Sequence, residues 1–234
     1  MANIDALQGP TLGPASGKAP ASAVVLVHGY GSNGDDLIGL APFFASALPG
    51  AIFYSPHAPD PWEGGMAGGR QWYSLAGFDP EAIQRDPLRM GQTFQAMNER
   101  VVKAAVRLDL FLDQIMAAHD LPADGVALLG FSQGTIMSLH VGLRRASQIG
   151  AILGFSGALS AADRLESEIK TKPPVALVHG AADPVIPSRA TTETEKVLKG
   201  LGVPCQALII PNLQHGIDNA GANFGAQFLK ALIG

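Results

Sequence analysis

The feature that most constrains this fold is a serine between two glycines, where an apolar run gives way to a helical stretch. The pattern G-x-S-x-G occupies residues 130–134, behind the apolar run 126–129 and ahead of the helical stretch 135–141. A strand, a sharp turn and a helix in that order form a nucleophile elbow, which exposes the serine hydroxyl above a sheet. We expect a side chain at either glycine to collide with the neighbouring strand or helix. The pattern therefore predicts Ser132 as a nucleophile in an α/β protein.

Two later loops supply the partners that such a serine needs. A serine hydroxyl is a weak nucleophile until a histidine takes its proton, and a carboxylate orients that histidine. Asp183 follows the apolar run 175–180, and His215 follows the apolar run 205–210. Both therefore lie after predicted strands, at the carboxyl edge where open α/β sheets place their ligands. We predict a catalytic triad of Ser132, Asp183 and His215.

A glycine-rich loop near the N-terminus predicts where negative charge would be stabilised. The apolar run 24–27 leads into the loop 28–31. With an elbow of this type, one oxyanion donor comes from such a loop and the other from the residue after the nucleophile. We assign the two backbone N–H donors to Tyr30 and Gln133. Because both act through the backbone, we expect their side chains to matter little, and we expect His28 to support the loop.

The other histidines have simpler structural interpretations than that of a catalytic base. His57 and His179 are expected to support loops near the site. His119 ends a predicted helix, where the helix dipole favours a cation. His140 lies eight residues after Ser132 on the next predicted helix and is expected to point elsewhere.

Alternatives to the acid and to the nucleophile are also present. Asp163 and Asp218 compete with Asp183, although Asp218 immediately precedes a predicted helix and is more simply explained as its N-cap. Ser156 lies in the stretch G-F-S-G-A, which resembles an elbow but lacks the final glycine. Cys205 is the single cysteine, so that no internal disulfide forms, and its place in an apolar run predicts an inert core thiol.

Apolar strands and helical stretches alternate along the chain. We predict strands at 23–28, 51–55, 125–130, 149–154, 174–179 and 204–210, and helices at 35–47, 94–118, 133–145, 188–200 and 218–232. This alternation is typical of a mostly parallel sheet with helices on both faces. The 234 residues fit one domain, 1–234, with no large cap domain.

Residues 60–92 interrupt the alternation. A long irregular segment inside a compact domain is usually functional or disordered. This one follows a predicted strand on the edge that carries Ser132, so we interpret it as a cover over the active site. The residues expected to line a substrate pocket are Met66, Trp72, Tyr73, Leu75 and Phe78. The alternative is that the aromatic residues only pack the segment onto the sheet.

The composition excludes several classes of partner. The net charge is −4 and no basic stripe is present, which argues against nucleic-acid binding. Residues 125–143 are uncharged, but polar side chains and a glycine pair interrupt them, so we predict a buried strand and helix rather than integral membrane association. No signal segment is apparent, which predicts a cytoplasmic protein. We find no phosphate loop, dinucleotide fingerprint or metal motif, and expect no cofactor or metal. A homodimer stays an open alternative.

Several collinear stretches carry a family resemblance. They are His28-Gly29-Tyr30-Gly31, Ser55-Pro56-His57-Ala58-Pro59, Arg70-Gln71-Trp72-Tyr73, Gly130-Phe131-Ser132-Gln133-Gly134, His179-Gly180 with Asp183-Pro184-Val185, and His215-Gly216. On these stretches, roughly residues 5–232 resemble the carboxylesterase/phospholipase family of α/β-hydrolases, which includes the acyl-protein thioesterases. Two positions depart from that pattern. Gln214 stands where many relatives have glycine, and Ser74 stands where an aspartate often follows the aromatic pair.

The resemblance implies a serine hydrolase that cleaves small or acyl esters, or thioesters, through an acyl-serine intermediate and without a cofactor. Within that class a carboxylesterase is expected, with a lysophospholipase or an acyl-protein thioesterase as alternatives. Serine peptidases of this fold often carry an added domain, for which the chain has no room. The alternative from another class is a catalytically silent hydrolase fold that serves as a binding protein.

Overall fold

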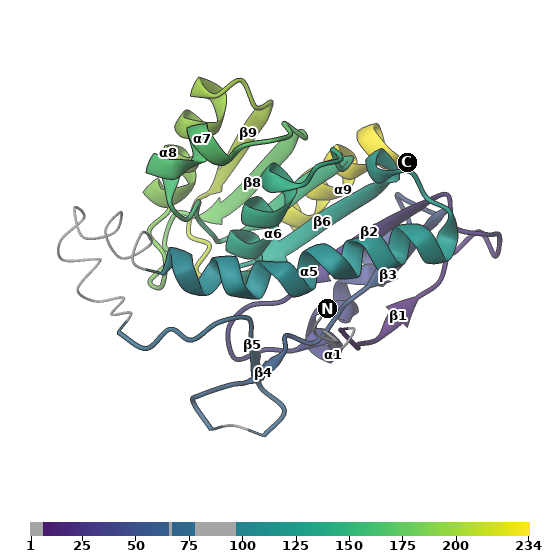
Figure 1. Ribbon diagram of the computed structural model, residues 1–234, viewed down its shortest axis with the longest axis horizontal. Coiled ribbons are helices and arrows are strands. Elements are labelled where there is room, and N and C mark those ends of the chain that lie inside the picture. Colours follow the sequence, from purple (N-terminus) through teal and green to yellow (C-terminus); the bar gives the residue numbers. More distant parts are fainter. Residues whose placement is uncertain (1–6, 66, 78–96) are drawn as a thin grey trace.

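The computed structural model describes residues 7–65, 67–77 and 97–234, and it contains a twisted central sheet with helices on both faces (Figure 1). The strands lie in the order β1 (Thr11–Leu12), β3 (Ala51–Tyr54), β2 (Ser22–Val27), β6 (Val126–Phe131), β7 (Ala151–Phe155), β8 (Val175–Gly180) and β9 (Cys205–Ile210). All neighbouring pairs are parallel except β1 with β3. The predicted α/β class with a mostly parallel sheet is therefore confirmed.

The order of the strands determines where a site can form. From β2 the chain moves to β3 on one side, and it later returns to place β6 on the other side of β2. At such a reversal the loops after the two strands diverge and leave a crevice beyond their carboxyl ends. The two loops at this crevice are 28–31, after β2, and the elbow at Ser132, after β6.

Helices cover the two faces of the sheet with two separate cores. The helices are α1 (Gly34–Leu37), η1 (Ile38–Leu40), α2 (Ala41–Ala45), α5 (Asn98–His119), η2 (Ala123–Gly125), α6 (Gln133–Arg144), α7 (Ala162–Glu168), α8 (Arg189–Gly200) and α9 (Asn219–Ile233). Val25 and Leu128 face the core shared with α5, α6 and α8. Val24 and Leu129 face the core shared with α2 and α9. Strand residues thus alternate between two apolar layers, as a sheet buried on both faces requires.

Most predicted elements lie within a few residues of the observed ones, with three differences. The expected helix at 35–47 is divided into α1, η1 and α2, because Pro42 has no N–H to continue the helical ladder. Helix α7 was not expected from the sequence. The segment between β3 and α5 contains a short antiparallel hairpin, β4 (Asp60–Pro61) with β5 (Arg70–Gln71).

The uncharged stretch 125–143 forms β6 and α6, whose residues are almost all buried in the protein interior. Across the described residues, no helix combines the length and the apolar character needed to cross a membrane.

Candidate active site

Ser132 lies in a strained turn between β6 and α6. Its φ is 54° and its ψ is −115°, a backbone conformation that residues other than glycine rarely adopt. A Cβ on Gly130 would lie 2.5 Å from the Gly134 oxygen, and a Cβ on Gly134 would lie 1.8 Å from the oxygen of Val27 in β2. Both glycines are therefore required by close backbone approach, as expected for a nucleophile elbow.

Hydrogen bonds from the next strand fix this turn. The Ser132 N–H donates to the Phe155 oxygen at 2.8 Å, and the Ser132 oxygen accepts from the Thr135 N–H at 2.9 Å. The Thr135 hydroxyl lies 2.9 Å from the Gly130 oxygen and 2.8 Å from the Phe155 oxygen. The position of Ser132 thus depends on β6, β7 and α6 together.

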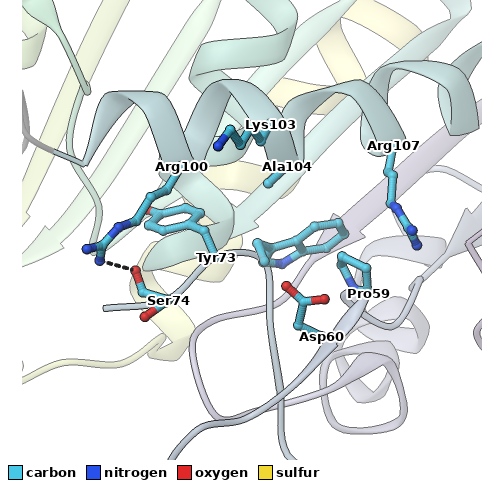
Figure 2. A pocket seen from close by; sticks show the side chains of 9 residues that line it. Pro59, Asp60, Tyr73, Ser74, Arg100, Lys103, Ala104 and Arg107 are labelled. Carbon is cyan, nitrogen blue, oxygen red and sulfur yellow. Dashed lines mark hydrogen bonds between the residues drawn. The ribbon is translucent and has the colours of Figure 1, made fainter. Parts of the chain in front are cut away.

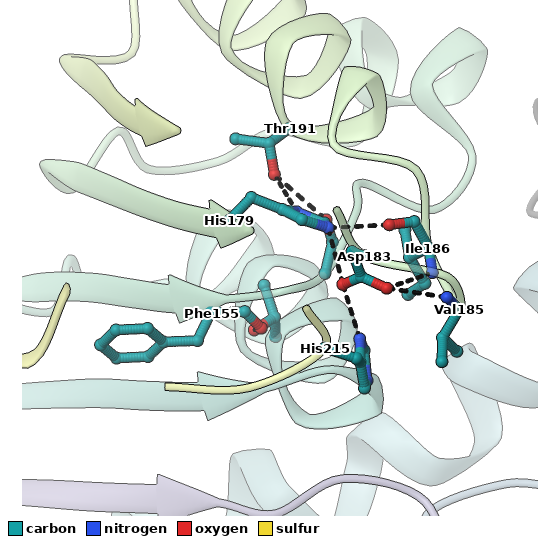
Figure 3. A network of polar contacts seen from close by, with 9 residues as sticks. Phe155, His179, Asp183, Val185, Ile186, Thr191 and His215 are labelled. Carbon is teal, nitrogen blue, oxygen red and sulfur yellow. Dashed lines mark hydrogen bonds and ion pairs between the residues drawn. The ribbon is translucent and has the colours of Figure 1, made fainter. Parts of the chain in front are cut away.

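The structure brings Asp183 and His215 together at the carboxyl edge of the sheet (Figure 3). Nδ1 of His215 lies 2.7 Å from Oδ2 of Asp183. Oδ1 accepts from the N–H groups of Val185 at 2.8 Å and Ile186 at 2.9 Å. Burial alone would raise the pKa of Asp183, but hydrogen bonds from His179, His215 and the Ile186 N–H hold that pKa well below its usual value. The carboxylate is therefore an anion at neutral pH.

The loop that carries His215 approaches the sheet closely. A Cβ on Gly180, at the end of β8, would lie 2.2 Å from the Leu213 oxygen, so that only glycine fits there. The His215 ring packs against Phe131, with 5.0 Å between ring centroids, and Phe131 immediately precedes Ser132. His215 consequently contacts both the Asp183 carboxylate and the side chain that precedes the elbow serine.

The loop 28–31 lies against the elbow from the side of β2. A Cβ on Gly29 would come within 3.4 Å of the Ser132 Cβ. The Gly31 N–H donates to the Arg70 oxygen at 2.9 Å, and the Arg70 N–H donates to the Ser32 oxygen at 2.8 Å. Strand β5 thereby anchors the loop that contains Tyr30.

His28 supports this loop from the protein interior, as expected. Its Nε2 accepts from the Ala58 N–H at 2.9 Å, and its Nδ1 lies 2.8 Å from the Gly29 oxygen. Burial lowers the pKa of His28 to about 4. The ring is therefore neutral, with its proton on Nδ1, where it can donate to Gly29.

Comparison with known proteins shows the family of the chain. The family described as Phospholipase/Carboxylesterase matches residues 14–233. The chain belongs to the phospholipase/carboxylesterase family.

Three relatives show how names vary among similar chains. Esterase YpfH of Escherichia coli (strain K12) is 25% identical over 90% of this chain and 82% of its own length. Acyl-protein thioesterase 1 of Neurospora crassa is 28% identical over 88% of this chain and 84% of its own length. A protein of Oryza sativa subsp. japonica named a probable inactive carboxylesterase is 30% identical over 94% of this chain and 89% of its own length.

A solved structure shares the fold over nearly the whole chain. The crystal structure of esterase PE8 is 34% identical, has a TM-score of 0.86, and covers 97% of this chain and 100% of its own. Relatives with different names share the family, so family membership alone does not define the substrate of this chain.

The side chain of Gln133 matters in this family member, contrary to expectation. Its Nε2 donates to the Tyr73 oxygen at 2.8 Å, and its Oε1 accepts from the Trp72 N–H at 2.8 Å. The amide thus holds the segment 72–73 against the first turn of α6. A sequence argument that used only the backbone of Gln133 could not detect this role.

Trp72 lies beneath the loop 28–31 rather than in the pocket at Ser132. Its side chain is 1% exposed, and its indole N–H donates to the His28 oxygen at 3.0 Å. Trp72 and Tyr73 also border a groove of about 350 Å³, together with Arg100, Lys103 and Arg107 of α5 (Figure 2). Its indole thus packs under the loop, and the placement of Trp72 in a substrate pocket stays a prediction.

A small apolar pocket opens beside Ser132. Its volume is about 30 Å³, and it is lined by Tyr73, Leu75, Met97, Ser132, Gln133, Ile136, Val185 and Ile186. Tyr73 and Leu75 were expected there. Met66 and Phe78, the other residues expected to line a pocket, lie outside the described residues.

Glu63 links the loop 28–31 to the pocket wall, and the sequence contained no clear sign of this. Its Oε1 accepts from the Tyr30 hydroxyl at 2.6 Å and from the Leu75 N–H at 2.9 Å. Its Oε2 accepts from the Ser74 hydroxyl at 2.7 Å, and the Ser74 and Tyr30 bonds lower the pKa of Glu63. A carboxylate from Glu63 thus contacts Ser74, the residue that follows the aromatic pair.

Several competing residues have other roles in the structure. Asp218 caps α9 by accepting from the Gly221 N–H at 2.8 Å. His119 pairs with the Tyr54 hydroxyl at 2.6 Å, and the His57 Nδ1 accepts from the Gly34 N–H at 3.1 Å. Each of these contacts explains the residue without catalysis.

Buried histidines predict how stability depends on pH. Burial lowers the pKa values of His28 and His140 to about 4, whereas unfolded histidines titrate near 6.5. Between these values the unfolded chain binds more protons than the folded chain, so the free energy of unfolding should decrease as the pH falls from 6.5 to 4. Urea unfolding across this range measures the slope. The variant His140→Gln should reduce the slope of unfolding free energy against pH. An unchanged slope would contradict the lowered pKa of His140.

Proposed function

We propose that the chain is a cytoplasmic serine hydrolase that cleaves carboxylic esters, with Ser132 as the nucleophile, His215 as base and acid, and Asp183 as the group that orients His215. The observation that supports this most strongly is the 2.7 Å contact of Asp183 with His215, whose ring packs beside a strained elbow serine. The same chemistry would also act on thioesters, because both substrates present a carbonyl carbon to the serine oxygen.

The proposed reaction has two halves. His215 Nε2 takes the hydroxyl proton as Ser132 Oγ bonds to the carbonyl carbon, and the carbonyl oxygen becomes negatively charged. When the tetrahedral intermediate collapses, the bond to the leaving group breaks and His215 returns the proton to the departing alcohol or thiol. Water then attacks the acyl-serine with His215 again as the base, which releases the acid and restores the Ser132 hydroxyl.

We propose the backbone N–H groups of Tyr30 and Gln133 as the oxyanion donors. Gln133 is the first residue of α6, so its N–H is among those that a helix leaves without an internal partner. Preorganised donors of this kind cost no reorganisation when the charge develops, and removal of one typically lowers kcat about 10²- to 10³-fold. The anchoring of the loop 28–31 by β5 and the clamp made by Gln133 both favour such preorganisation.

A fluorophosphonate probe tests the proposal directly. Such a probe labels a serine that a neighbouring base activates, so the wild-type chain should be labelled at Ser132 and the Ser132→Ala variant should not. A wild-type chain that stays unlabelled at high probe concentration would support the catalytically silent alternative. A panel of matched oxygen esters and thioesters then separates carboxylesterase from thioesterase preference.

Acyl-chain preference should follow the small pocket. Each buried methylene contributes about 0.8 kcal/mol until the pocket is filled, so kcat/KM for aryl esters should rise over the first few carbons and then level or fall. Ile136→Ala removes part of the pocket wall and should move the optimum to a longer acyl chain. Trp72→Ala should lower kcat/KM for short and long acyl esters by similar factors, because Trp72 supports the loop 28–31 and does not line this small pocket.

The comparison of these two variants decides between the assignments. If the loss of kcat/KM in Trp72→Ala grows with acyl length, Trp72 contacts the acyl chain. An unchanged optimum in Ile136→Ala would show that the acyl chain binds elsewhere.

A further inference from the structure

His179 makes an unusually complete set of contacts around the proposed triad acid. It is the fifth residue of β8 and its side chain is fully buried. Its Nε2 lies 3.0 Å from Oδ2 of Asp183 and 2.9 Å from the Ile186 oxygen. Its Nδ1 lies 2.7 Å from the Thr191 hydroxyl oxygen, in α8 (Figure 3).

The partners of Nε2 determine where a proton must be. A carbonyl oxygen and an ionised carboxylate carry no proton, so the nitrogen that faces both has to be the donor. Nε2 of His179 therefore carries hydrogen and shares it between Ile186 and Asp183. Oδ2 of Asp183 consequently accepts two imidazole N–H groups, one from His179 and one from His215.

These contacts constrain the carboxylate from both sides. The backbone N–H groups of Val185 and Ile186 hold Oδ1, and they belong to the same loop as Asp183. His179 belongs instead to β8, which lies between two parallel strands of the sheet. The bond from His179 thus relates the loop carboxylate to the rigid sheet.

We propose that His179 is a positioning residue of the catalytic unit, whose Nε2–H holds the Asp183 carboxylate in the orientation that meets His215. The inference rests on the proposed function, and it extends that function by a fourth side chain. A carboxylate without this second donor could rotate about its side-chain torsions, and the alignment of His215 with Ser132 would then become less well defined. Fixed orientation of such groups is what makes electrostatic stabilisation effective in an active site.

Two isosteric amides separate the contacts of His179. The amide of asparagine reaches only the position of Nδ1, so His179→Asn keeps a polar group near Thr191 but removes the donor to Asp183. The amide nitrogen of glutamine reaches the position of Nε2, so His179→Gln keeps that donor. With a short-chain aryl ester, we expect His179→Asn to lower kcat about 10- to 100-fold, as for loss of one hydrogen bond to a charged group, with KM nearly unchanged. His179→Gln should stay within about threefold of wild type.

A double-mutant cycle with Asp183 tests whether His179 acts through that residue. Asp183→Asn should already have lost most of the activity, so adding His179→Asn should lower kcat by less than about twofold more. Thermal unfolding of each variant reports its stability, and His140→Gln is the matched control for replacement of a buried histidine outside this network. It should keep the wild-type kcat.

Three results would overturn the inference. The first is equal kcat for His179→Asn and His179→Gln at equal stability. The second is a loss of kcat from His179→Asn that is as large in the Asp183→Asn background as in the wild type. The third is a His179→Asn variant with the kcat of the wild type. Failure of the proposed function is distinguishable from these. In that case Ser132→Ala would retain activity, whereas a failure of this inference alone leaves Ser132→Ala inactive.

Discussion

Ser132→Ala is expected to lower kcat by about 10⁴- to 10⁶-fold, because the nucleophile and its base act as a unit. The alanine variant keeps the elbow glycines and the hydrogen bonds of the Ser132 backbone, so its fold should be unchanged. Steady-state hydrolysis of a chromogenic ester, with active-site titration to exclude wild-type contamination, measures the effect.

His215→Ala should cost about as much, and the double variant should be little slower than either single one. Effects that multiplied in the double variant would contradict a shared catalytic unit. Ser156→Ala is the matched control, since Ser156 is also buried, follows a strand in a similar pattern and has a positive φ of 48°. That variant should retain activity, and its inactivation would make Ser156 a rival for the nucleophile.

The sequence predicts those parts of the site that depend on short local patterns of residues. The elbow pattern follows an apolar run, and the parallel strands alternate with helices, so the edge that carries Ser132, Asp183 and His215 follows from topology alone. The contact of Asp183 with His215 needs only that β8 and β9 be neighbours.

The side-chain contacts that hold the loops around the site cannot be predicted from local patterns, because they depend on packing between segments that are distant in the sequence. The Gln133 amide meets a backbone about sixty residues earlier in the chain, in a segment without periodicity. Glu63 meets Tyr30, 33 residues away, and Ser74. An aromatic residue in an irregular cover suggests a ligand pocket, and the sequence alone does not indicate that the Trp72 indole N–H donates to the buried His28 oxygen. Apolar character indicates burial and does not say which surface is buried.

Gly134→Ala is expected to be the most destabilising single methyl addition at the site. The added Cβ would lie 1.8 Å from the Val27 oxygen, 2.5 Å from the Val27 carbonyl carbon and 2.8 Å from the His28 oxygen. These are backbone atoms of the neighbouring strand, so no side chain can rotate away to relieve the collision. Either α6 must move away from β2, or the strands β2 and β6 must separate. We expect a loss of more than about 4 kcal/mol in the free energy of unfolding, or insoluble protein.

Gly200→Ala provides the matched control for that prediction. Gly200 is the last residue of α8, and a Cβ there would meet no atom within 4 Å. Alanine is a better helix former than glycine by up to about 1 kcal/mol, so this variant should be neutral or slightly more stable. Urea unfolding of the wild type and both variants makes the comparison at one temperature. A soluble Gly134→Ala protein within about 1 kcal/mol of wild type would contradict the close approach of α6 to β2, on which the geometry of Ser132 and the loop 28–31 depends.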